Sequence, residues 1–250
     1  KALPQWVGVN AANDRGKRIK VIPLVHSAQA IQPGHVMHDL VNNGAGAGYY
    51  RPFDVHQAYG APLTLHVTPT LASGLQWARV DTNQGPAFKD GPALNARIAA
   101  LASNGVVQLL GSTFADHLMP YFTPDYTADN VALAHEVLSG IYGQGVVSTQ
   151  SFWTPERLLD ADVLDKVKAL GFQATFLDQS QHLRRWFSLA ASQGEDAYRI
   201  NRIRGVDCFV INDRFNAYRF SSTDNGPSIA LREILNRRAR SGWWGNQHPQ

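Results

Sequence analysis

A carboxylate and a tryptophan lie three positions apart in the segment 151–157, as Trp153 and Glu156. The preceding run 146–149 is short and rich in β-branched residues, which predicts a buried strand, and the run 161–170 has the apolar spacing of an amphipathic helix. Glu156 is therefore expected on a strand-to-helix loop, where barrels of alternating strands and helices carry their active sites. The alternative is structural: Glu156 pairs with a neighbouring arginine and Trp153 packs.

Three further residues with useful chemistry follow predicted strands: His26 and Asp178 stand at strand ends, and His117 lies in the loop 111–117 after the strand 106–110. If these strands are parallel, their ends meet at one edge of the sheet. Imidazoles, carboxylates and a tryptophan together suit a pocket for a neutral polyhydroxylated ligand, because aromatic faces pack on sugar rings and charged groups accept their hydroxyls. A histidine at a strand end is more often a structural donor, so the prediction rests on the convergence.

The elements that must position these residues alternate along the chain. Such alternation favours a mostly parallel α/β sheet, either open or closed into a barrel, and nothing divides residues 1–250 into separate domains. We therefore expect one barrel domain. The predicted strands are 20–26, 63–68, 106–110, 146–149, 172–177 and 206–211, and the predicted helices are 94–102, 130–138 ended by Gly140, 161–170 ended by Gly171, and one from Pro227 to Leu235.

The composition is that of a globular protein, with 44% hydrophobic and 17% charged residues. No apolar run approaches the roughly 20 residues of a membrane helix. The 23 Lys and Arg residues against 20 Asp and Glu give a net charge of +3, which is too balanced to indicate a nucleic-acid partner. The single cysteine, Cys208, lies in an apolar run and allows no disulfide framework. Compartment and oligomeric state stay open.

On these residues the chain resembles glycoside hydrolase family 57, within the wider glycoside hydrolase and deacetylase superfamily. The segment 152–157, followed by a helix and a strand ending at Asp178, is similar to the motif that carries the nucleophile of that family. Residues 26–29 with Pro33 resemble its first motif, and the run 108–120 resembles its second. Only the nucleophile motif is specific.

The resemblance implies a (β/α)7-type barrel that hydrolyses or transfers α-glucan-like saccharides with retention and without a cofactor or metal. Glu156 would be the nucleophile, His26, His117 and Trp153 would line the adjacent subsite, and Asp178 would be an accessory contact. Retaining chemistry also needs a second carboxyl about 5 Å from the nucleophile.

Two departures from the family pattern modify this expectation. Gln108 stands where the family has Glu, and the family's acid is an Asp at the end of a last strand that this sequence lacks. Asp207, Asp213 and Asp224 come too early to replace it. We therefore expect a truncated chain and a barrel without its last strand.

Two other functions remain open. The first is a non-catalytic carbohydrate-binding domain derived from a hydrolase, which fits the missing acid. The second is a metal-dependent carbohydrate deacetylase, which would need an Asp and two suitably spaced histidines, whereas the loop 112–117 supplies one histidine.

Overall fold

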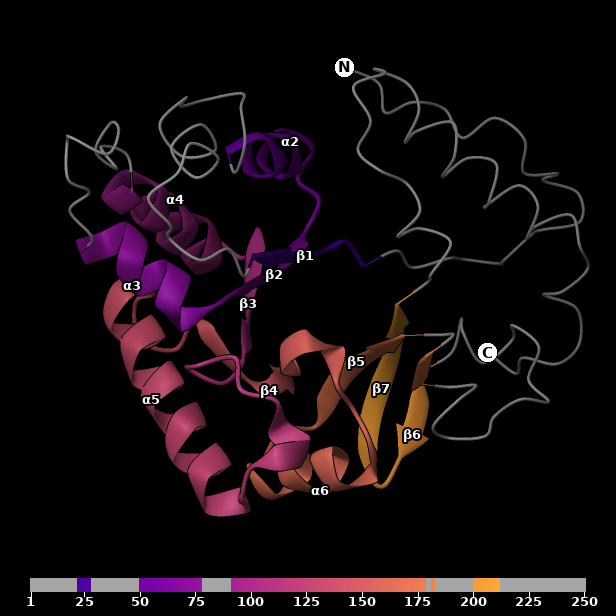
Figure 1. Ribbon diagram of the computed structural model, residues 1–250. Helices are drawn as coiled ribbons and strands as arrows, with labels where there is room; N and C mark the ends of the chain where they lie inside the picture. Colours follow the sequence, from indigo (N-terminus) through magenta and orange to yellow (C-terminus); the bar gives the residue numbers. More distant parts are fainter. Residues whose placement is uncertain (1–21, 28–49, 78–90, 179–180, 183–199, 212–250) are drawn as a thin grey trace, which may run out of the picture. The chain divides into compact units, whose positions relative to one another are not determined.

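The computed structural model describes residues 22–27, 50–77, 91–178, 181–182 and 200–211. These residues form a seven-stranded sheet accompanied by helices (Figure 1). The strands are β1 (Leu24–Ser27), β2 (Leu63–Val67), β3 (Val107–Gly111), β4 (Val147–Phe152), β5 (Ala174–Asp178), β6 (Asn201–Ile203) and β7 (Val206–Ile211). The helices are α2 (Tyr50–Tyr59), α3 (Pro69–Trp77), α4 (Gly91–Ser103), α5 (Pro124–Tyr142) and α6 (Ala161–Ala169), with the 3-10 turns η2 (Met119–Tyr121) and η3 (Pro155–Arg157).

The chain divides into two compact units. The larger unit comprises residues 22–177 and 201–209. The smaller comprises residues 1–21, 178–200 and 210–250, of which only 178, 181–182, 200 and 210–211 are described. A single domain over residues 1–250 stays a prediction.

The strand order is β1-β2-β3-β4-β5-β7-β6. The first five strands pair in parallel, and β6 and β7 form an antiparallel hairpin. The predicted α/β class with a mostly parallel sheet is therefore confirmed. In the described part of the chain β1 and β6 lie at the two edges of an open sheet, so barrel closure is not seen there.

All six predicted strands are present. Strand β6 and helices α2 and α3 were not predicted from the sequence. The helix predicted over 130–138 was placed too short. It begins at Pro124, because the side chain of Thr123 accepts the backbone N–H of Tyr126 and proline suits the first turn. It runs through Gly140 to Tyr142, with Gly143 as its C-cap, since packing outweighs the low helix propensity of one glycine. The helix predicted from Pro227 lies outside the described residues.

The core lies where α3, α4 and α5 pack on one another and on β3 and β4. All five residues of β2 are buried, so Leu63, Leu65 and Val67 join this core while Thr64 and His66 occupy the opposite face. Cys208 on β7 is buried, as predicted.

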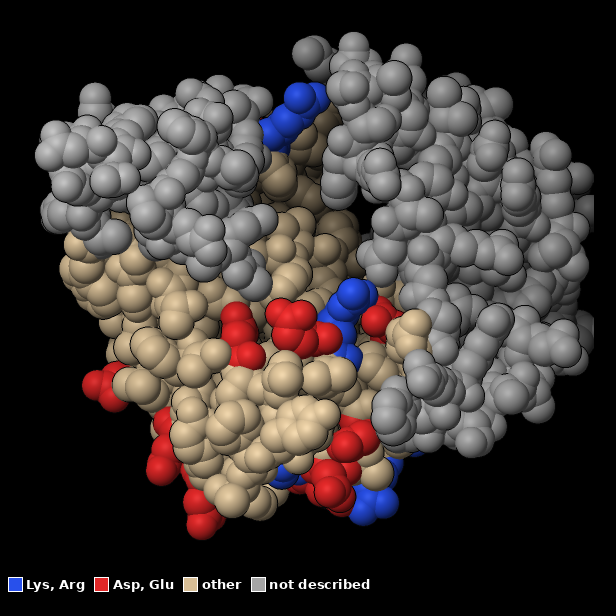
Figure 2. All heavy atoms as spheres, viewed as in Figure 1, with Lys and Arg blue, Asp and Glu red and all other residues tan. Residues whose placement is uncertain are grey.

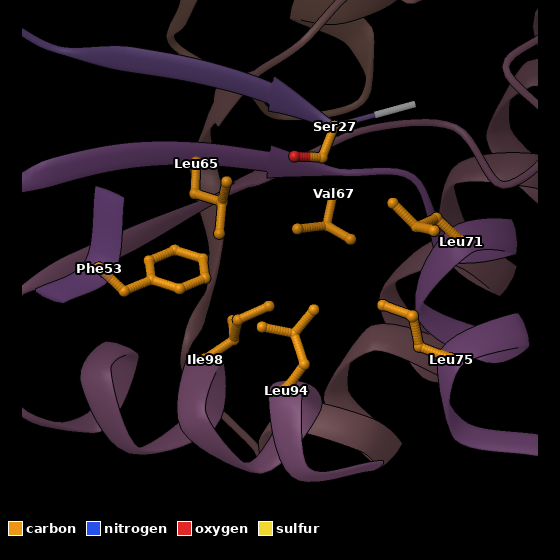
Figure 3. Close-up of a pocket in the computed structure, with 8 residues that line it drawn as sticks. All are labelled: Ser27, Phe53, Leu65, Val67, Leu71, Leu75, Leu94 and Ile98. Carbon is orange, nitrogen blue, oxygen red and sulfur yellow. The ribbon is translucent and has the colours of Figure 1, made fainter. Parts of the chain in front are cut away.

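A small cavity remains within the apolar core, between β1, β2, α2, α3 and α4 (Figure 3). Its volume is about 10 Å³, room for one water molecule at most, so it cannot hold a sugar ring. The lining is apolar except for one hydroxyl, and consists of Ser27, Phe53, Leu65, Val67, Leu71, Leu75, Leu94 and Ile98.

Gly111, the last residue of β3, has no room for a side chain. A Cβ there would lie 2.6 Å from the ring of Phe172 and 2.9 Å from the carbonyl oxygen of Ser148. We expect Gly111→Ala to lower the free energy of unfolding by about 1–3 kcal/mol through overpacking. Gly140→Ala is the matched control, because that Cβ meets nothing within 4 Å and should add up to about 1 kcal/mol of helix stability.

Urea denaturation of both variants measures this contrast. Equal effects of the two substitutions would contradict the close packing around Gly111.

Candidate active site

A bulge in β4 brings the segment that follows it against the end of β3. Leu109 pairs with Val147 but Gly111 pairs with Phe152, so β4 carries extra residues between these two pairs. The hydroxyl of Ser148 accepts the backbone N–H groups of Gln150 and Ser151 at 3.2 and 2.9 Å, which holds the bulge in shape. Bulges often re-aim side chains next to active sites.

Two hydrogen bonds then fix Trp153 at the sheet edge. Its backbone N–H donates to the carbonyl of Gly111 at 2.8 Å, and its carbonyl accepts the hydroxyl of Ser112 at 3.3 Å. The loop after β4 is thereby tied to the loop after β3.

Glu156 lies in η3 with an exposed side chain and a left-handed backbone, φ 50° and ψ 13°. Arg157 beside it has φ 52°, and Asp116 in the loop after β3 has φ 47°. Of the four non-glycine residues with positive φ in the described ranges, three therefore lie on these two loops, and the fourth is Arg204 in the β6–β7 turn. Such conformations cost about 1 kcal/mol or more each and gather at functional sites.

Three rings stack at the ends of β1, β2 and β4. His26 and His66 are register partners in the parallel pair β1–β2, and their ring centroids are 4.8 Å apart. The indole of Trp153 stacks on both, at 4.7 Å from His26 and 5.5 Å from His66. The Nδ1 atoms of the two histidines are 2.7 Å apart and share a hydrogen bond. His26 is exposed, whereas His66 and Trp153 are buried.

Electrostatics connect this stack to Glu156. Although His26 keeps exposed surface, its partial burial lowers its pKa, with Glu156 raising it and Arg157 lowering it to smaller extents. Burial, and then the neighbouring His26, hold the pKa of His66 well below its ordinary value. Both rings are therefore neutral near pH 7.

The charge of Glu156 also affects the pKa of Asp116. Burial, followed by the charge of Glu156, raises the pKa of Asp116 to about 6. Its Oδ1 is buried and has no hydrogen-bond partner in the described structure. In Figure 2, acidic side chains and a basic one gather across the middle of the visible face, in the region of β4.

His117 packs into the base of the loop after β3. Its ring meets Phe122 and Tyr126 edge-on at 4.9 and 5.0 Å, and its Nε2 lies 3.3 Å from the hydroxyl of Thr127. Burial is the main cause that lowers its pKa. Asp178 ends β5 in the smaller unit, and its backbone N–H donates to Nδ1 of His182 at 2.8 Å.

The structure thus brings His26 and Trp153 into ring contact and places Glu156 within electrostatic range of His26. Trp153 packs on the histidines with 3% exposure. The substrate-binding roles of His26, His117, Trp153 and Asp178 stay predictions.

Sequence reasoning missed His66 and Asp116. The alternation of Thr64, His66 and Thr68 with apolar residues is a signal that the second face of this strand carries polar side chains. Asp116 could have been found because it directly precedes His117 in the loop after the strand 106–110.

No group of three or more His, Cys, Asp or Glu side chains in the described residues could hold a metal ion. No helix in the same ranges has both the length and the apolar character to cross a membrane.

Comparisons with known proteins indicate a family for this chain. The profile of Glycosyl hydrolase family 57 matches residues 59–237. A search of curated proteins finds no match. The 4-alpha-glucanotransferase of Thermococcus litoralis has a similar fold, with a TM-score of 0.62 and 14% identity, over 88% of this chain and 31% of that protein. The chain therefore spans about a third of that relative's length.

Two other solved structures are less similar, with TM-scores below 0.5. The GH57-type branching enzyme of Pyrococcus horikoshii gives a TM-score of 0.49 at 12% identity, over 77% of this chain and 47% of that one. The alpha-amylase AmyC of Thermotoga maritima gives 0.48 at 8% identity, over 80% and 46%.

The raised pKa of Asp116 has a consequence for stability. In the folded state Asp116 keeps its proton up to about pH 6, whereas the ordinary pKa of the carboxyl is 3.8. The folded state therefore loses stability relative to the unfolded state as the pH rises from 3.8 through about 6. Asn cannot ionise and tolerates the left-handed backbone. Asp116→Asn should therefore gain stability relative to the natural sequence between about pH 4 and about pH 7.5.

Urea denaturation across that pH range measures the difference. Asp129→Asn, which removes an exposed carboxylate from α5, is the matched control. A stability difference for Asp116→Asn that does not change with pH would refute the assignment.

Proposed function

Because the chain belongs to glycosyl hydrolase family 57, we propose that it acts on α-linked glucan or oligosaccharide, as a glycosidase or a glucanotransferase, through Glu156. The observation that carries the proposal is the placement of this carboxylate. It is exposed on a strained turn, beside a stack of two neutral histidines and a tryptophan.

In the proposed reaction the Glu156 carboxylate attacks the anomeric carbon and forms a glycosyl ester while the glycosidic C–O bond breaks. The leaving oxygen takes a proton from a second carboxyl, which then removes a proton from the acceptor as the ester is opened. Water as acceptor gives hydrolysis, and a sugar hydroxyl gives transfer. The family resemblance assigns the second carboxyl to an Asp on a later strand.

The strained backbone supports a role for Glu156 as nucleophile. A left-handed turn places the side chain in solvent, where a sugar can reach it, and the hydrogen bonds that close η3 hold that turn. Arg157 N–H donates to Thr154 O, and Leu158 N–H donates to Pro155 O, each at 3.1 Å. A fixed carboxylate loses little entropy when the sugar binds.

The neutral histidines suit an uncharged ligand. An imidazole that stays neutral offers one donor and one acceptor to sugar hydroxyls and adds no positive charge that would pair with Glu156. Asp116 holds a proton below about pH 6, which reduces the negative charge around Glu156.

A non-catalytic carbohydrate-binding domain is the second candidate. Gln108, exposed on β3, stands where the family resemblance expects a Glu, and an amide cannot exchange a proton as a carboxyl does.

Replacement of Glu156 tests the proposed nucleophile. In the natural full-length gene product, Glu156→Gln should lower the release of reducing sugar from soluble starch by about 10³-fold or more, with folding and glucan binding retained. Glu136→Gln, at an exposed carboxylate on α5, is the control and should keep full activity. Survival of activity in Glu156→Gln would rule out the nucleophile assignment.

Intact mass and starch assays of the natural product beside the 250-residue chain separate the two candidates. A longer product that alone is active supports the enzyme. A natural product that binds glucan and releases no sugar favours the binding domain.

A further inference from the structure

The hydrogen bond between His26 and His66 constrains the protons on both rings. Each neutral imidazole carries one N–H and one bare nitrogen. Since the contact joins the two Nδ1 atoms at 2.7 Å, one Nδ1 donates and the other accepts. Two arrangements are therefore possible, and they leave different groups at the two Nε2 atoms.

The buried Nε2 of His66 distinguishes the two arrangements. His66 has no exposed surface, and its Nε2 has no hydrogen-bond partner in the described structure. If His26 donated, His66 would bury an unpaired N–H. If His66 donates, it buries only a bare nitrogen. Unpaired buried N–H groups are rarer in proteins than unpaired buried acceptors, so the second arrangement costs less.

We propose that His66 is a positioning residue, which donates its Nδ1–H to His26 and thereby fixes His26 as the tautomer with its proton on Nε2. The consequence for catalysis rests on the proposed function. The exposed ring of His26 then presents an N–H donor, which serves a sugar hydroxyl oxygen or the carboxylate of Glu156.

The same bond keeps His26 neutral. Protonation of His26 would add a proton at Nδ1, where the N–H of His66 already points, so either the hydrogen bond breaks or His66 moves its own proton to its buried Nε2. The groups that face His26 are His66 from β2 and Glu156 and Arg157 from η3. Their combined effect with burial lowers the pKa of His26, which agrees with this restraint.

Stacking supports a fixed ring orientation. The planes of His26 and His66 differ by 12°, and the indole of Trp153 lies within 23° of both. The strand register that pairs His26 with His66 holds the backbones in place. Rotation of either ring would therefore break the stack together with the hydrogen bond.

Long-range ¹H–¹⁵N correlation spectra of the ¹⁵N-histidine-labelled chain test the proposal directly. Among the nine histidines, the signals of His26 and His66 are identified by their loss in His26→Gln and His66→Asn. We expect a single tautomer for each ring, with the proton of His26 on Nε2 and that of His66 on Nδ1. A His26 proton on Nδ1, or a mixture of tautomers, overturns the proposal.

Two variants separate the donor from mere packing. His66→Leu removes the donor, so His26 should show both tautomers and a higher pKa. In His66→Asn the amide N–H should replace the donor and restore the His26 tautomer with its proton on Nε2. In the full-length protein His66→Leu should lower kcat roughly tenfold, with His66→Asn recovering most of it. An unchanged His26 tautomer in His66→Leu overturns the proposal.

If His66→Leu fails to fold, the spectrum of the natural sequence still decides the tautomer. Because that spectrum needs no turnover, a failure of the glycosidase proposal leaves this test intact.

Discussion

The parallel pairing of β1 to β4 is the constraint on which the candidate active site depends. It brings the carboxyl ends of four strands to one edge and sets His26 opposite His66. Residues far apart in the sequence thereby reach one another without long loops. The buried β2 strengthens this arrangement, because its apolar face anchors the core while its other face carries His66 to the site.

A second constraint is local and costs free energy. The bulge in β4 and the left-handed residues Asp116, Glu156 and Arg157 are unfavourable for an isolated chain. They persist because the surrounding bonds outweigh them: Ser148 closes the bulge, and Gly111 accepts from Trp153. Gly111 also permits close approach at this point, since a side chain there would meet Phe172. The same contacts that shape the core therefore hold the loop 153–157 in its strained form.

Much of the sheet could be predicted from sequence, because short runs rich in β-branched residues and leucine stand out between helical patterns. The beginning of α5 was missed although Thr123 and Pro124 carry a capping signal, since the apolar spacing starts later. β6 has three residues, too few for any period. The position of Glu156 on a strand-to-helix loop was predictable. His66 was not identified as a site residue, because its partner lies on another strand and only the register reveals the pair.

The charge balance around Glu156 follows from burial more than from ion pairing. Burial is the first cause that lowers the pKa values of His26 and His66 and raises that of Asp116. Each group is thus moved towards its neutral form by the same physical effect. A site built in this way leaves the exposed carboxylate of Glu156 near two neutral histidines, while Arg157 adjoins it in η3. An anionic ligand would find no positively charged histidine there to offset its charge. A neutral polyhydroxylated ligand could hydrogen-bond to these groups without the cost of removing another charged group from water.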